Sequence, residues 1–311
     1  MKTAFLFAGQ GSQKVGMAKE FYDTFTVSQK RMDGLQCDYD LKRLCFEGPQ
    51  DQLDDTAYAQ SAIVAASLTI LEALKEKGIQ ADGCAGLSLG EYTALCAAQS
   101  FDPQTAIDIV RQRGILMAQA LPAGTTGMAA VLGLDENAIQ EVCQIVTRSN
   151  QILEIANYNC PGQIVVTGHK EAIEQATPLL LEKGARRVLP LSVSGAFHSS
   201  LLIPASEKLE AVLRTKHFAL PKIPVYHNIS GQVESIQQEE DLIQILKKQI
   251  CQSVRFEQTI RQMIKDGFDT FVEIGPGKSL SGFVRKVSKD VQVYTINTVQ
   301  DLEGMVETWN R

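Results

Sequence analysis

The sequence lacks the patterns by which metals, disulfides and nucleic acids are usually recognised. Its seven cysteines stand singly with no CxxC pair, and its four histidines are equally dispersed, so neither zinc-ligand spacing nor a disulfide framework is present. Scattered cysteines fit a reducing cytoplasm. The net charge of −6, without a basic block, argues against nucleic-acid binding through bulk electrostatics. We therefore expect no nucleic-acid partner and no metal or redox cofactor.

Long uninterrupted apolar runs are missing as well. Residues 1–8 contain a lysine and a short apolar run, but the Gly-Gln-Gly-Ser-Gln stretch at 9–13 ends it far short of a signal-peptide core, so we interpret it as a first strand. The run at 63–74 carries serine, threonine and glutamate, and we expect it to be too polar and too short to span a bilayer. With 44% hydrophobic and 21% charged residues, the composition is that of a soluble globular protein without a membrane function.

Strand-like runs alternate with long helical patterns over much of the chain. Apolar runs at 3–8, 83–88 and 270–274 predict strands, and 61–77 predicts a helix that Gly78 ends. This alternation favours an α/β fold, which we expect to be a large α/β-hydrolase-like domain made of residues 1–124 and 195–311.

Between residues 125 and 194 the pattern of predicted secondary structure changes to a compact series of shorter strands and helices. The expected order is strand, helix, strand, strand, helix, strand, at 127–132, 135–147, 153–158, 163–168, 170–183 and 186–191. This βαββαβ order is the ferredoxin-like arrangement. We therefore predict an inserted small domain at 125–194, with hinges at 122–124 and 194–195.

The motif Gly86-Leu87-Ser88-Leu89-Gly90 is a GxSxG match between a strand pattern and a helical pattern. This is the setting of a nucleophile elbow, in which the glycines allow a sharp turn and the serine hydroxyl stands clear of the sheet. The amide of Leu89, at the N-terminus of the following helix, would face a developing oxyanion. The alternative is a helix-capping serine flanked by fortuitous glycines.

A nucleophilic serine needs a neighbouring base, and the chain offers four histidines. His169, His217 and His227 have ordinary settings at a strand-to-helix junction, a lysine-rich helix end and a strand-to-turn passage. His198 lies among small residues at the return from the inserted segment, where a side chain can project into a cleft. The alternative for His198 is a packing role between domains.

The segment 103–120 predicts a helix with an apolar stripe, and Arg113 lies at the centre of that stripe. Arg111 projects to the opposite side. A guanidinium on a core-facing stripe needs an anion, because an unpaired buried charge is poorly solvated. A ligand carboxylate would match its planar fork. The alternatives are a structural ion pair, or a guanidinium that reaches water past Gly114.

Several motifs in order along the chain resemble one family. They are Gly9-Gln10-Gly11-Ser12-Gln13, Gly86-Leu87-Ser88-Leu89-Gly90-Glu91-Tyr92, Arg113-Gly114, Gly195-Ala196-Phe197-His198 and Glu273-Ile274-Gly275-Pro276-Gly277. Together they resemble the malonyl-CoA:acyl carrier protein transacylases over nearly the whole chain, from Phe5 to about Asn297.

The resemblance implies a role for each matching residue. Ser88 would be the acylated nucleophile, His198 its base and Arg113 the clamp on the malonyl carboxylate. Gln10 and the Leu89 amide would form the oxyanion hole. In this family a main-chain carbonyl holds the histidine in place of an aspartate, and Asn228 matches that position. Gln249 matches a further glutamine near the active site.

The sequence departs from the family pattern at a few positions. Leu87 replaces the histidine that many members have before the nucleophile, which we expect to alter packing or hydrogen bonding at the elbow. Phe256 stands for a usual tryptophan and Cys160 for a common serine. Phe197 matches the malonyl-selective form of its motif, so malonyl is expected rather than methylmalonyl.

The resemblance implies a ping-pong transfer of a malonyl group from malonyl-CoA, through Ser88, to an acyl carrier protein. A monomer is the default expectation. Carrier proteins are acidic, and the candidate basic patches, which are otherwise ordinary solvated faces, are Lys183, Arg186 and Arg187, or Arg285 and Lys286. Two other functions fit parts of the sequence: a serine hydrolase that releases the acyl group to water, and a non-catalytic module that binds the carrier protein.

Overall fold

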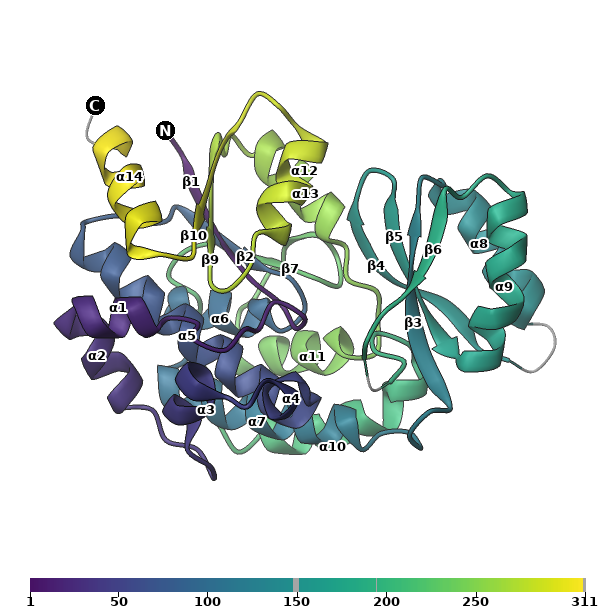
Figure 1. Ribbon diagram of the computed structural model, residues 1–311, viewed down its shortest axis with the longest axis horizontal. Helices are drawn as coiled ribbons and strands as arrows, with labels where there is room; N and C mark the ends of the chain where they lie inside the picture. Colours follow the sequence, from purple (N-terminus) through teal and green to yellow (C-terminus); the bar gives the residue numbers. More distant parts are fainter. Residues whose placement is uncertain (148–150, 194, 310–311) are drawn as a thin grey trace.

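The computed structural model describes residues 1–147, 151–193 and 195–309, arranged around two β-sheets (Figure 1). The larger sheet has the strand order β10-β9-β1-β2-β7-β8, and all neighbouring strands are parallel except β7 and β8. Its strands are β1 (Thr3–Phe7), β2 (Gly83–Gly86), β7 (Val225–His227), β8 (Gln232–Val233), β9 (Thr270–Ile274) and β10 (Gln292–Ile296).

Helices cover both faces of this sheet, as its fully buried central strands require. On β1, Phe5 and Phe7 point into the main core, whereas Ala4 and Leu6 point into a second apolar cluster on the opposite face. The helices of the large region are α1 (Lys19–Thr24), α2 (Thr26–Asp33), α3 (Leu41–Glu47), α4 (Gln50–Asp54), α5 (Thr56–Glu76), α6 (Gly90–Ala97), α7 (Pro103–Ala118), α10 (Ile203–Leu213), α11 (Glu239–Gln249), α12 (Phe256–Lys265), α13 (Ser279–Val287) and α14 (Val299–Trp309), with a short 3-10 turn, η1 (Ser200–Leu202).

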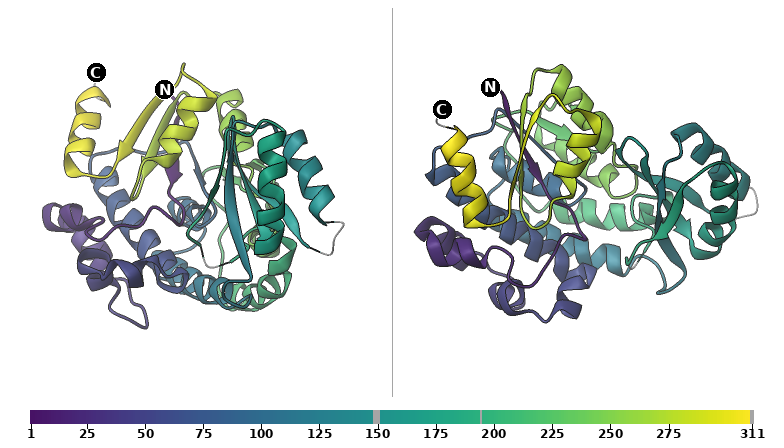
Figure 2. Two further views of the ribbon diagram at one scale, coloured as in Figure 1. Left: turned by 45° about the vertical axis from the view of Figure 1, so that its right-hand side comes forward. Right: turned by 45° about the horizontal axis from the view of Figure 1, so that its top comes forward.

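The second sheet is built from the segment that the sequence singled out. Its elements are β3 (Thr126–Leu132), α8 (Glu136–Thr147), β4 (Leu153–Cys160), β5 (Gln163–His169), α9 (Lys170–Glu182) and β6 (Arg187–Pro190). The strands are antiparallel in the order β4-β5-β3-β6, which is the ferredoxin-like arrangement, and the two helices lie on one face (Figures 1 and 2). The expected fold class is confirmed.

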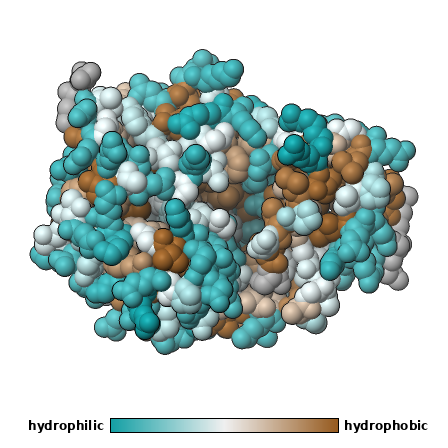
Figure 3. All heavy atoms as spheres, viewed as in Figure 1, coloured by the Kyte–Doolittle hydropathy of each residue, from teal (hydrophilic) through white to brown (hydrophobic). Residues whose placement is uncertain are grey.

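The other face of the small sheet packs against the large region. Met128, Ala130 and Val165 belong to the main core, and Val254 pairs with the free edge of β4 through Asn157. Apolar side chains also gather on the surface over this sheet (Figure 3). Division of the chain into independent domains stays a prediction, and Ser194, part of the second predicted hinge, lies outside the described residues.

The expectation that the run at 63–74 is too short to cross a membrane is wrong. The run is part of α5, which has 21 residues and is long and apolar enough to span a bilayer by length and composition. The helix starts early because the Asp55 side chain accepts a hydrogen bond from Ala57 N–H and caps it. In the folded chain 83% of its most apolar window is buried by protein, which is the burial of a core helix.

Candidate active site

The candidate site forms where neighbouring parallel strands end. Gln10 follows β1, Ser88 follows β2 and Asn228 follows β7, and these three strands are adjacent in the sheet. The carboxyl ends of parallel strands face the same edge, which is where α/β proteins commonly bind ligands. The sheet therefore brings together residues that lie up to 218 positions apart in the sequence.

The turn at Ser88 has the strained geometry of a nucleophile elbow. Ser88 has φ of 51°, a left-handed conformation that is uncommon outside glycine. The flanking glycines are required by close backbone approach, because a Cβ on Gly86 would lie 1.9 Å from the carbonyl carbon of Gly90, and a Cβ on Gly90 would lie 2.0 Å from Phe7 O. The tight turn ends β2 at Gly86, short of the predicted strand end at 88.

His198 contacts the serine directly. Its Nε2 lies 2.7 Å from Ser88 Oγ, and its Nδ1 lies 2.8 Å from the main-chain oxygen of Gln249. A carbonyl can only accept, so Nδ1 carries the proton, Nε2 is the acceptor and the serine hydroxyl donates. Burial, aided by the charge of Arg113, lowers the pKa of His198 to about 4, which keeps the imidazole neutral and able to accept a proton.

The prediction that the main-chain carbonyl of Asn228 holds His198 is wrong. Gln249, at the end of α11, supplies the oxygen that holds His198, because the chain after α11 passes beside the histidine loop and His198 N–H donates to Ile250 O. Asn228 holds the elbow instead. Its Oδ1 accepts from Ser88 N–H at 2.7 Å, and its Nδ2 donates to Gly86 O at 2.7 Å.

Arg113 lies beside Ser88, and the groups that accept its hydrogen bonds are all neutral. Its side chain is buried, with 1% exposed, and donates to Gln60 Oε1 at 2.8 Å, Gln249 Oε1 at 3.0 Å and Ser88 Oγ at 3.1 Å. Among the described residues no carboxylate oxygen lies within 4 Å of it, and its Nε has no hydrogen-bond partner. Both alternative interpretations, a structural ion pair and a side chain that reaches water, are therefore wrong.

Close packing of α5 and α7 places this arginine. A Cβ on Gly114 would lie 2.6 Å from Thr56 O, so the small residue after Arg113 lets the two helices approach. Gln60 on α5 then reaches both Arg113 and Gln10, whose side chain also donates to Thr56 Oγ1 at 2.8 Å. These contacts hold the Gln10 side chain against α5 at the end of β1.

A family model described as "Acyl transferase domain" matches residues 4–304. The chain belongs to this family. The resemblance drawn from the sequence motifs is confirmed, and the fold can be described as that of an acyltransferase.

Named relatives of this acyltransferase are similar over their whole length. The malonyl CoA-acyl carrier protein transacylase of Bacillus subtilis is 42% identical over 309 residues, covering 99% of this chain and 97% of the relative. The crystal structure of the corresponding protein from Clostridium perfringens has a TM-score of 0.94 at 38% identity and covers 100% and 98% of the two chains. A malonyl-transacylase in complex with a type II PKS acyl-carrier protein has a TM-score of 0.93 at 36% identity and covers 99% and 100%.

Several buried polar residues of the acyltransferase site were not found from the sequence. Gln60 binds Arg113, and Glu154 on β4 accepts from both the main-chain N–H and the hydroxyl of Ser200, which anchors the loop after His198. Glu91 and His227, both fully buried, contact each other below the elbow. A polar residue inside an apolar helix was the available signal for Gln60, as it was for Arg113.

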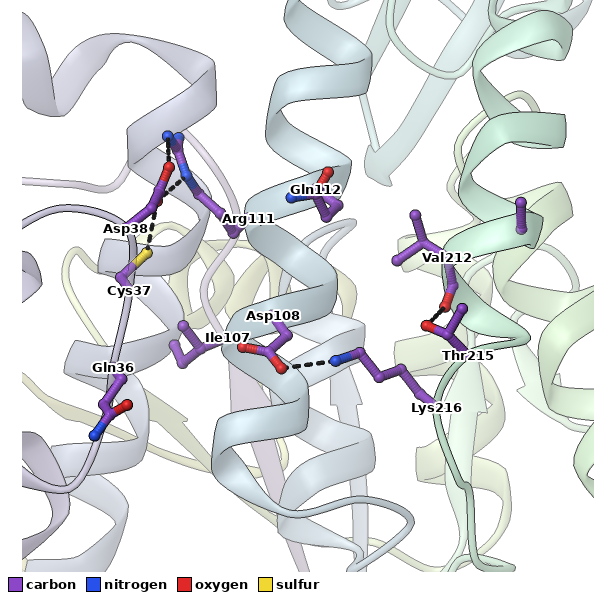
Figure 4. Close-up of a pocket in the computed structure, with 11 residues that line it drawn as sticks. Gln36, Cys37, Asp38, Ile107, Asp108, Arg111, Gln112, Val212, Thr215 and Lys216 are labelled. Carbon is purple, nitrogen blue, oxygen red and sulfur yellow. Dashed lines mark hydrogen bonds and ion pairs between the residues drawn. The ribbon is translucent and has the colours of Figure 1, made fainter.

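A large groove on the acyltransferase surface lies away from this site. It has a volume of about 590 Å³ and is lined by α7, α10 and the segment at 36–38 (Figure 4). Its charged side chains already pair with one another, Arg111 with Asp38 and Lys216 with Asp108. A cavity of about 340 Å³ between β4 and the segment at 251–255 reaches His198 and is the better candidate for access.

The positions that depart from the family pattern fit into apolar packing. Leu87, Cys160 and Phe256 belong to, or pack against, the apolar cluster on the α12 and α13 side of the sheet. Phe197 is buried beside His198. Within the described residues, no group of three or more histidine, cysteine, aspartate or glutamate side chains is arranged to hold a metal ion.

Proposed function

We propose that this acyltransferase moves a malonyl group from malonyl-CoA to the phosphopantetheine thiol of an acyl carrier protein, through a malonyl ester on Ser88. The observation that carries this proposal is Arg113, a buried cation 3.1 Å from Ser88 Oγ with no carboxylate partner among the described residues. An acyl group that bears its own carboxylate would supply the missing anion where the ester forms.

In the first half-reaction Ser88 Oγ attacks the thioester carbonyl carbon and passes its proton to His198 Nε2. The amides of Leu89 and Gln10 are the proposed donors to the oxyanion, since both flank the elbow at the strand ends. The carbon–sulfur bond then breaks, and His198 returns the proton to the sulfur of coenzyme A as it leaves.

In the second half-reaction the carrier thiol gives its proton to His198 and attacks the ester carbon. The bond from that carbon to Ser88 Oγ breaks, and the proton returns to the serine. The proton therefore goes back and forth between His198 and the reacting atoms, with no net change in the enzyme. A histidine kept neutral by burial suits both steps.

The identity of the partners is supported by the relatives, whose names specify malonyl CoA and acyl carrier protein. We propose malonyl over methylmalonyl because Phe197, buried next to His198 in the sequence, matches the malonyl-selective form of its motif. The carrier would dock near Arg187 or near Arg285 and Lys286, whereas Lys183 is already paired with Glu141. The seven free thiols support a reducing, cytoplasmic location, and a monomeric state stays a prediction.

The mass of the intact protein after exposure to malonyl-CoA tests this proposal. We expect one malonyl adduct on the wild type and none on Ser88→Ala, because the serine oxygen is the only atom that receives the acyl group. An adduct that persists on Ser88→Ala would refute the nucleophile.

Product analysis separates the two other functions. Addition of carrier protein should convert the adduct into malonyl-carrier protein. Free malonate formed equally fast with and without the carrier would indicate a hydrolase, and binding of the carrier without any adduct would indicate a docking module.

A further inference from the structure

Glu91 and His227 form a buried pair that the proposed reaction does not use. Glu91 is in the first turn of α6, just after the elbow, and His227 is the last residue of β7. Both side chains are 0% exposed, and His227 Nδ1 lies 2.6 Å from Glu91 Oε1. Two ionisable groups without access to water need a structural or functional reason.

The direction of their hydrogen bond follows from the other contacts of Glu91. Its Oε2 accepts from Asn228 N–H at 3.1 Å and lies 3.2 Å from Gln249 Nε2. A carboxylate surrounded by N–H donors acts as an acceptor at both oxygens, so the imidazole donates through Nδ1. His227 Nε2 is then an acceptor, and it has no partner among the described residues.

The pair touches the two residues that hold the reacting groups. Gln249 lies between two charges, with its Nε2 toward Glu91 and its Oε1 toward Arg113, so its amide has one favourable orientation. In that orientation Nε2 also donates to Ser88 O at 2.6 Å. Asn228, the second residue bound by Glu91, accepts from Ser88 N–H.

We propose that Glu91 and His227 are positioning residues for acyl transfer: His227 orients the Glu91 carboxylate, which sets Asn228 and Gln249 and thereby aligns Ser88 with His198. The inference rests on the proposed function. It predicts that the pair acts on the rate of acylation and not on the binding of the thioester, because both side chains are fully buried and act through Asn228 and Gln249.

The test compares His227→Leu, which removes the donor, with His227→Asn, whose Nδ2 can replace the imidazole Nδ1. The acylation rate per acylable site and the KM for malonyl-CoA are measured by rapid quench and intact-protein mass. We expect His227→Leu to lower the rate by about 10- to 100-fold with KM within twofold, since small displacements of reacting groups have effects of this size. His227→Asn should recover most of the rate.

Glu91→Gln provides a second variant in case His227→Leu fails to fold. An amide has a single acceptor oxygen for three facing donors, so the rate should fall similarly. The double variant should lose little more than the worse single variant if both act through one bond, and losses that multiply would overturn the inference. A lower acylable fraction with an unchanged rate per site would also overturn it. A wild type that takes no malonyl group would instead refute the proposed function.

Discussion

Helix α7 carries two arginines, two residues apart, in opposite electrostatic settings. Arg111 faces the outer groove, where its guanidinium binds both oxygens of Asp38 at 2.7 and 2.8 Å (Figure 4). It also lies over the rings of Tyr39 and Tyr58. Arg113 faces inward, lies over the ring of Tyr92, and donates its hydrogen bonds to amide and hydroxyl oxygens. The charge of Arg111 is paired with a carboxylate of the protein, whereas that of Arg113 has no carboxylate partner among the described residues.

The difference supports the proposal that Arg111 stabilises the fold and that Arg113 binds a ligand. A protein can satisfy the hydrogen bonds of a buried guanidinium with neutral groups while leaving its charge available. Gln60 and Gln249 do this for Arg113. Four predictions test this comparison.

The largest expected effect is that of Arg113→Ala on malonyl transfer. Loss of a desolvated charge contact costs about 2–5 kcal/mol, so acylation by malonyl-CoA should fall by roughly 30- to 5,000-fold. Acylation by acetyl-CoA, which has no carboxylate, should be unchanged or faster. The two rates are measured side by side, and an equal loss of both would exclude Arg113 as the clamp.

Gln60→Glu should give Arg113 the kind of partner that Arg111 has. The substitution is nearly isosteric and places a carboxylate at the oxygen that now lies 2.8 Å from Arg113 Nη1. We expect malonyl acylation to fall by about 10- to 100-fold through competition for the guanidinium, while acetyl acylation is largely retained. Thermal unfolding serves as the control for folding, and an unchanged malonyl rate would show that the carboxylate does not bind here.

The pH dependence of acylation tests the effect of Arg113 on its neighbour. Because burial and the Arg113 charge lower the pKa of His198 to about 4, the rate should be nearly flat from pH 8 to 6 and fall only toward pH 4. The unfolded chain protonates this histidine below about 6.5, so folding stability should also decline as the pH falls from 6.5 to 4. Acetyl acylation of Arg113→Ala should show a higher inflection, and an inflection near 6.5 in the wild type would contradict this account.

Arg111→Ala is the matched control and should have the smallest effect. Its ion pair with Asp38 is partly exposed, so we expect a loss of about 1 kcal/mol in the free energy of unfolding. Malonyl and acetyl acylation should both stay within twofold of the wild type. Denaturant unfolding and acylation rates measure this, and a loss of malonyl selectivity would show that the two faces of α7 are not independent.

Much of the fold was predictable from local rules. The GxSxG motif predicted the sharp turn at Ser88, the small sheet has its predicted order of elements, and the apolar stripe of α7 predicted that Arg113 faces the core. The start of α5 was missed, because it depends on a cap at Asp55.

Long-range contacts were harder to predict. Asn228 and Gln249 were both placed near the site by resemblance, but their tasks were not, since the oxygen that reaches His198 depends on how the end of α11 packs. His227 looked ordinary in the sequence because its partner Glu91 lies 136 residues away.

The sequence by itself determined the sharp turn at Ser88 and an inward-facing cation, because backbone sterics and helical periodicity act over a few residues. Only the tertiary structure decided that Arg113 meets no carboxylate among the described residues, that Gln249 holds the histidine, and that Glu91 and His227 lie beneath the elbow. These contacts join strand ends and helices distant in the chain, and packing alone sets which polar atoms meet.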